Sequence, residues 1–154
     1  MNTLERSRRA VETVRRWIGT PYRHQGSVPG TGLDCLGLVR ALWREVEGAE
    51  PEPIPNYPSS WSRPRGGELL LGAACRWFVR TDGGTPAPAD VLVFRMRARA
   101  EASHCGIATG EGTFVHAYQG NGTVETRLDA FWRRRLVHTA SFPCLAHPSA
   151  KEAR

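Results

Sequence analysis

Apolar residues recur at helical spacing in the first half of the chain. A first helix is expected over about residues 3–18, where one face carries Leu4, Val11, Val14 and Ile18. A second is expected over about residues 35–47, where the face that packs on the core carries Cys35, Val39, Leu42 and Val46. A third is expected over residues 68–80. Cys35 therefore begins a helix face that is predicted to be buried.

From Asp90 onward the pattern changes to short segments rich in β-branched and aromatic residues, separated by turn residues. Such segments are typical of strands, which we expect over residues 90–94, 105–109, 113–118 and 123–128, with a last strand near 141–145. Helices followed by strands predict an α+β fold with an antiparallel sheet. No repeat divides the chain, so one domain is expected over residues 1–146, followed by a flexible tail over 147–154.

The predicted strand register places two histidines side by side. If Gly110–Gly112 forms a three-residue hairpin loop, Gly106 is the partner of His116. Because side chains alternate with a period of two, one face then carries His104, Gly106, Phe114, His116 and Tyr118. His104 lies diagonal to His116, within reach of two imidazoles, and Gly106 leaves the space between them open. Cys105 falls on the opposite face with Ile107, which predicts a core residue that is no part of a site.

Two segments rich in glycine and proline are expected to be irregular. Residues 20–33, TPYRHQGSVPGTGL, lead into Cys35, and residues 48–67 carry five prolines. A loop this long within one domain is often functional. Tyr57 and Trp61 indicate that the second loop packs over something, and whether it gates a groove stays open.

Composition narrows the classes of partner. The chain has 154 residues and a net charge of +6, which favours acidic partners such as an anionic cell envelope. Its basic residues are scattered and include no nucleic-acid-binding motif, so nucleic-acid binding is not expected. The charged N-terminus does not resemble a signal peptide, and no stretch approaches the roughly 18 apolar residues of a membrane span. A soluble protein made in the cytoplasm is therefore expected.

The chemistry-bearing residues predict an activated thiol. A helix start is served better by Ser, Thr, Asp or Asn than by Cys, whereas a thiol there gains a lowered pKa. His104 could accept the thiol proton, and His116 could hold His104 in the required tautomer. Asp34 could contribute to catalysis or be only a helix cap, and both interpretations stay open.

Other cysteines and histidines are read as structural. The four cysteines form no C-x-x-C motif, and His24, His138 and His147 are taken as structural or surface residues. Cys35, Asp34, His104 and His116 could in principle bind zinc, but no short ligand spacing of the H-E-x-x-H or C-x-x-C kind occurs. Neither a metal nor another cofactor is therefore expected.

The motifs also resemble a known family. GTPYRHQGS, GLDCLGLVR, ADVLVFR and HCGIATGEGTFVHAY follow one another in the order and approximate spacing of the NlpC family of cell-wall cysteine peptidases, over about residues 14–130. The resemblance implies a reduced papain-like α+β fold in which Cys35 is the nucleophile, His104 the general base and His116 the orienting residue. Tyr22 matches an aromatic position on the substrate and oxyanion side.

The resemblance further implies a substrate and a setting. The family typically cleaves the D-γ-glutamyl–diaminopimelate amide of peptidoglycan stem peptides without a cofactor. The chain is most similar to the branch encoded with phage tails and gene-transfer particles, where Leu commonly follows the nucleophile, as Leu36 does. A particle-associated enzyme acting on the periplasmic cell wall is the expectation. Two alternatives are an amidase or acyltransferase on the same fold and a catalytically silent tail-tip protein.

Four positions depart from the usual family pattern. Leu36 replaces a small residue, Ala89 replaces the Gly before the first strand's Asp, and HCGIA replaces HVGIY. Leu36 and Ala89 put the exact substrate pocket in doubt, while the three catalytic positions match.

Overall fold

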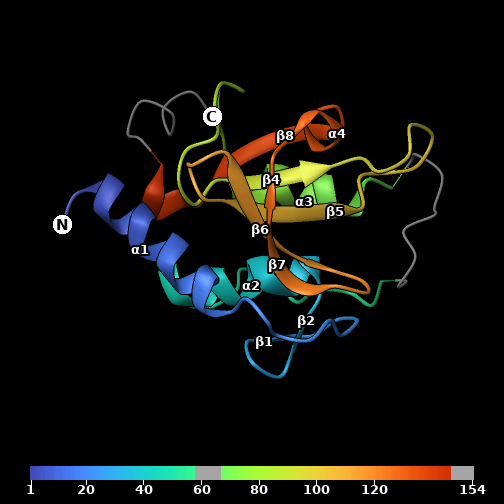
Figure 1. Cartoon of the computed structure of the whole chain (residues 1–154), viewed down its shortest axis with the longest axis horizontal. Helices are drawn as coiled ribbons and strands as arrows, with labels where there is room; N and C mark the ends of the chain where they lie inside the picture. Colours follow the sequence, from blue (N-terminus) through green and yellow to red (C-terminus); the bar gives the residue numbers. More distant parts are fainter. Residues whose placement is uncertain (58–66, 147–154) are drawn as a thin grey trace.

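Antiparallel strands form the centre of the structure, a computed structural model that describes residues 1–57 and 67–146 (Figure 1). The main sheet has the order β3-β8-β4-β5-β6-β7. Its strands are β3 (Val79–Arg80), β4 (Val91–Phe94), β5 (His104–Ala108), β6 (Thr113–Tyr118), β7 (Gly122–Arg127) and β8 (Leu136–Ser141). A small ribbon of β1 (Ser27–Val28) and β2 (Gly32–Leu33) lies in the loop that leads into Cys35.

Helices cover both faces of the sheet. They are α1 (Thr3–Arg16), α2 (Cys35–Val46), α3 (Leu69–Trp77) and α4 (Ala130–Arg133), followed by a 3₁₀ turn, Pro143–Leu145. Figure 1 places α1 and α2 below the sheet and α4 above it. The helical side holds the larger core, in which Leu38 and Leu42 of α2 pack with Ile107 and Val115 of the sheet. On the other side a smaller cluster contains Phe94, Phe114 and Trp132.

The α+β architecture and the helix starts are confirmed, with two corrections. The third helix ends at Trp77, and Val79–Arg80 form the edge strand β3. The last strand is Leu136–Ser141, and the segment expected to be that strand holds the 3₁₀ turn. Pro143 explains the second difference, because proline supplies no N–H for a ladder and favours the first turn of a helix.

The predicted hairpin register is confirmed. Ile107 pairs with Val115 and Ala108 with Phe114, which sets Gly106 opposite His116. A Cβ added at Gly106 would lie 2.9 Å from Phe114 and 3.1 Å from the His116 Cβ atom. The absence of a side chain at Gly106 therefore makes room for the neighbouring rings.

Ala89 has a backbone conformation that explains why glycine is usual at this position. Its φ angle is +71°, and its side chain is buried. The left-handed conformation costs an L-residue roughly 1–2 kcal/mol, while burial of one methyl group contributes about 0.8 kcal/mol. The two effects largely offset each other, so alanine is tolerated.

Candidate active site

Asp34 organises the start of α2. Its Oδ1 atom accepts a hydrogen bond from the Gly37 N–H at 2.7 Å, which is the helix-capping geometry. Its Oδ2 atom accepts one from the Gln25 N–H at 2.7 Å and one from the Tyr57 hydroxyl. Burial, followed by the negative charge of Cys35, raises the pKa of Asp34, while these three donors lower it. The capping interpretation is therefore confirmed.

Gly37 lets the glycine-rich loop approach α2. A Cβ atom at this position would lie 1.6 Å from the Gly26 carbonyl oxygen. The same oxygen accepts a hydrogen bond from the Asp34 N–H at 3.1 Å. This contact fixes the loop of residues 20–33 against the helix start and brings Tyr22 beside it through a parallel bridge to Leu33.

The Cys35 thiol lies at the N-terminus of α2, against the first residues of β5. It is 93% buried by residue surface, its side chain packs in the larger core, and its Sγ atom is 3.9 Å from the Ser103 carbonyl oxygen. A hydrogen bond from the Cys105 thiol, and then the hydrogen bond and charge of His104, hold the pKa of Cys35 well below its usual range. Burial acts in the opposite direction. The helix N-terminus further favours a thiolate.

The two histidines form a directed chain of hydrogen bonds. His104 Nε2 is 2.7 Å from His116 Nδ1, and His116 Nε2 is 2.8 Å from the Thr126 hydroxyl oxygen. Burial, followed by the charge of His104, lowers the pKa of His116 to about 3, so His116 is neutral at physiological pH. When His104 is protonated, its Nε2–H donates to His116, and His116 Nε2–H donates to Thr126. The other nitrogen of His104 is then available to the thiol.

Aromatic rings hold this pair in place. Trp132 from α4 packs on His104 and His116, with ring centroids 5.6 and 5.2 Å apart. Phe114 packs on His116 at 4.3 Å between centroids. These contacts restrict the imidazoles to the orientation that their hydrogen bonds require.

An open cleft of about 400 Å³ leads to the Cys35 thiol and the His104 imidazole. It is lined by Tyr22, Cys35, Met96, Ser103, His104, Ala117, Tyr118 and Gln119. Burial, and then the charges of Cys35 and Asp34, raise the pKa of Tyr22 to about 12, so its hydroxyl keeps its proton. The structure thus brings together four sequence-predicted residues, Tyr22, Asp34, Cys35 and His104, and joins His116 to them through His104.

Leu36 lies away from this cleft. It lines an apolar pocket between α2, α3 and the loop after α2, together with Val39, Trp43, Ile54 and Trp77. The larger side chain of Leu36 therefore packs in this apolar pocket. Leu36 is not among the described residues that line the cleft.

Cys105 is a core residue, as predicted. The alternation of the strand places it on the face opposite His104, and it is buried in the larger core. The start of α2 packs on that face, so the Cys105 thiol acts on the pKa of Cys35. Among the described residues it does not line the cleft.

Replacing Cys105 by Val is expected to raise the pKa of Cys35, because the thiolate loses a hydrogen-bond donor. The measurement is the rate of iodoacetamide alkylation of Cys35 against pH, with the labelled residue located by mass spectrometry. Both proteins should carry Cys75→Ala, which removes an exposed competing thiol. An unchanged midpoint would contradict this role of Cys105.

Sequence reasoning missed Thr126 and Trp132, which support the histidines. Thr126 could have been found by extending the hairpin register, since Phe114 pairs with Thr126 and His116 with Val124. No local sequence pattern indicates that Trp132 packs on the histidines. The loop residue Tyr57, expected only to pack, reaches Asp34, whereas Trp61, His147 and the predicted tail lie outside the described residues.

Within residues 1–57 and 67–146, no three His, Cys, Asp or Glu side chains come together in a way suited to a metal ion. No helix there combines the length and apolar character needed to cross a bilayer.

The chain is thus an α+β protein with a thiol at a helix start beside an imidazole pair on an antiparallel sheet. The model of the NlpC/P60 family matches residues 19–141, and the chain belongs to this family. The NlpC/p60 domain of the peptidoglycan hydrolase SagA has the same fold, with a TM-score of 0.61 and 22% identity. That match covers 86% of this chain and 96% of the SagA domain.

Several proteins of similar sequence are named as hydrolases or murein peptidases. The chain is 26% identical over 141 residues to a Bacillus subtilis gamma-DL-glutamyl hydrolase, and 26% identical over 130 residues to the Escherichia coli murein DD-endopeptidase MepH. It is 29% identical over 128 residues to the E. coli murein DD-endopeptidase MepS/murein LD-carboxypeptidase. These matches cover 90%, 83% and 82% of this chain, but 30%, 43% and 58% of the relatives.

Proposed function

We propose that this protein is a cysteine endopeptidase that hydrolyses an amide bond in peptidoglycan stem peptides. The observation that carries the proposal is the buried Cys35 thiol beside the His104–His116 pair, at the end of an open cleft. Membership of the NlpC/P60 family and relatives named for murein and γ-glutamyl hydrolysis support the substrate class.

The proposed reaction has two stages. His104 takes the thiol proton, and the Cys35 thiolate attacks the amide carbonyl carbon. The Cys35 backbone N–H, one of the free donors of a helix start, stabilises the oxyanion. His104 then returns the proton to the leaving amine, and a water molecule activated by His104 hydrolyses the thioester. Throughout, His116 stays neutral and accepts the His104 Nε2–H.

For the bond, we propose the amide between the γ-carboxyl of D-glutamate and diaminopimelate. The sequence motifs and the relative named gamma-DL-glutamyl hydrolase favour this bond. The relatives named murein DD-endopeptidases favour a second candidate, the D-alanyl–diaminopimelate cross-link.

The test is to incubate the protein with Gram-negative sacculi and identify the released fragments by mass spectrometry, with Cys35→Ala as the blank. New diaminopimelate amino termini from the wild type alone would support γ-glutamyl cleavage. Loss of cross-linked dimers with intact stems would favour the second candidate. An acyl group transferred to a new acceptor would indicate an acyltransferase, and no product while the thiol reacts with iodoacetamide would contradict the proposal.

For the setting, we propose that a phage or phage-like particle carries the protein to the periplasmic cell wall. The Asp34-Cys35-Leu36 motif, with its similarity to the phage-tail branch, supports this setting. The test is to purify particles from a producing strain and probe them with an antibody against the protein. Its absence from intact particles would contradict the proposal.

A further inference from the structure

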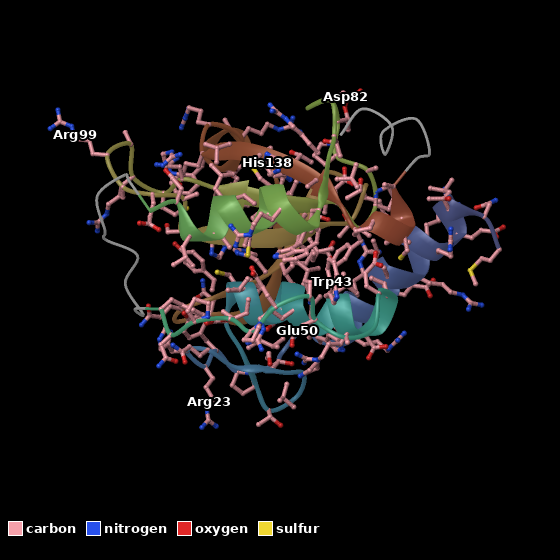
Figure 2. All side chains as sticks on the ribbon, turned by 180° about the vertical axis from the view of Figure 1, so that it is seen from behind. Arg23, Trp43, Glu50, Asp82, Arg99 and His138 are labelled. Carbon is pink, nitrogen blue, oxygen red and sulfur yellow. The ribbon has the colours of Figure 1, made fainter. Side chains whose placement is uncertain are left out.

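The proline-rich segment, residues 49–57, follows α2 and forms ion pairs with both α2 and α3. Glu50 forms an ion pair with Arg40 of α2 at 2.6 Å, and Glu52 forms one with Arg76 of α3 at 2.9 Å. Figure 2 shows Glu50 close to α2. The segment ends at Tyr57, whose hydroxyl reaches Asp34 at the start of α2.

Tyr57 completes the shell of donors around a buried carboxylate. The side of Asp34 that faces the loops accepts hydrogen bonds from the Tyr57 hydroxyl and the Gln25 N–H on one oxygen, while the Gly37 N–H donates to the other. The Gln25 side chain in turn donates to the Tyr57 carbonyl oxygen at 3.1 Å. Asp34 is 2% exposed and Tyr57 6% exposed, so water cannot easily replace the hydroxyl.

The carboxylate and the nucleophile share one helix start. Asp34 directly precedes Cys35, and the negative charge of each raises the cost of ionising the other. The other titratable groups that face this pair are His24 and Tyr22 from the first loop and His104 and Cys105 from β5. Among these, His104 and Cys105 act on the thiol, whereas Tyr57 donates to the carboxylate.

We infer that Tyr57 is a positioning residue of the Cys35 site. Its hydroxyl donates to Oδ2 of Asp34 and so offsets part of the carboxylate charge beside the thiol, and it holds Asp34 in place as the cap of α2. This inference rests on the proposed function, because it assigns Tyr57 a part in activating the proposed nucleophile. Through Tyr57, the proline-rich segment would contribute to the Cys35 site.

The test is iodoacetamide alkylation of Cys35 as a function of pH, in proteins that carry Cys75→Ala. Tyr57→Phe keeps the ring that packs edge-on against His24, at 5.2 Å between centroids, and removes only the hydroxyl. We expect the alkylation midpoint to rise by about 0.5–1 pH unit, which lowers the rate below the midpoint about three- to tenfold. In an Asp34→Asn background, Tyr57→Phe should leave the midpoint unchanged.

Two controls separate this role from a structural one. Glu52→Gln loosens the same segment on the α3 side without touching Asp34, and it should not move the midpoint. Incorporation of 3-fluorotyrosine at position 57, a stronger donor that needs no loss of contact, should lower the midpoint. If Tyr57→Phe fails to fold, the midpoint measured with 3-fluorotyrosine tests the inference by itself.

An unchanged or lowered midpoint in folded Tyr57→Phe, or an equal shift in Glu52→Gln, would overturn the inference. Alkylation requires no peptidoglycan cleavage. A protein that fails to hydrolyse sacculi but shows the expected shift would therefore contradict the proposed function while leaving the contact of Tyr57 with the thiol site supported.

Discussion

Removal of the Cys35 thiol is expected to lower the release of stem-peptide fragments by about 10⁴-fold or more, which would be indistinguishable from background. The reason is that Cys35 supplies the attacking atom in the proposed mechanism, and among the described residues no other cysteine lines the cleft. Cys105 is buried, and its pKa is raised well above the usual range by Cys35 and by burial. The measurement is the initial rate of fragment release by Cys35→Ala.

The matched control is Cys75→Ala. Cys75 lies exposed on α3, away from the cleft, and its loss should leave the rate within about twofold of the wild type. Residual hydrolysis by Cys35→Ala at more than about one hundredth of the wild-type rate would contradict a thiol mechanism. Equal losses in both variants would indicate damage to the fold.

Gly37→Ala is expected to destabilise the protein by at least about 3 kcal/mol, although alanine is the better helix former. The added Cβ would lie 1.6 Å from the Gly26 carbonyl oxygen and 2.7 Å from its carbon, and these backbone atoms cannot move aside as a flexible side chain could. Thermal unfolding followed by circular dichroism should show a midpoint lower by about 6 °C or more. Displacement of Gly26 would also remove the acceptor of the Asp34 N–H, so activity should fall in the protein that remains folded.

Gly72→Ala provides the comparison. Gly72 lies in α3, where the nearest atom to an added Cβ is the terminal nitrogen of Arg76 at 3.3 Å, which can move. This change should be neutral or stabilising by up to about 1 kcal/mol. A Gly37→Ala midpoint within about 2 °C of the wild type would show that the loop can retreat from α2 at little cost.

The local pattern of the sequence predicted most elements and the central geometry of the site. Strict alternation around a short Gly-Glu-Gly loop was enough to place His104 against His116, because a hairpin register depends only on nearby residues. Helical spacing likewise placed Cys35 at a helix start. The strand Leu136–Ser141 was missed because its assignment depends on pairing with β4, more than 40 residues earlier in the chain.

The supporting residues were harder to predict, for a related physical reason. Alternation gives the face on which Cys105 lies, but not which helix packs on that face. Trp132 sits in a four-residue helix whose position depends on the finished sheet. Tyr57 meets Asp34 through the path of a segment between α2 and α3 that no local periodicity specifies.

The placement of Trp132 against both imidazoles links activity to the completion of synthesis. During synthesis Cys35 is made early in the chain. Trp132, whose ring packs on His104 and His116, is made later, with α4, near the end of the described residues. Until α4 docks, the imidazole pair lacks one of the rings that pack on it. If Cys35 and His104 act as proposed, a chain cut before α4 is therefore expected to be inactive, which ties activity to residues far from Cys35 in the sequence.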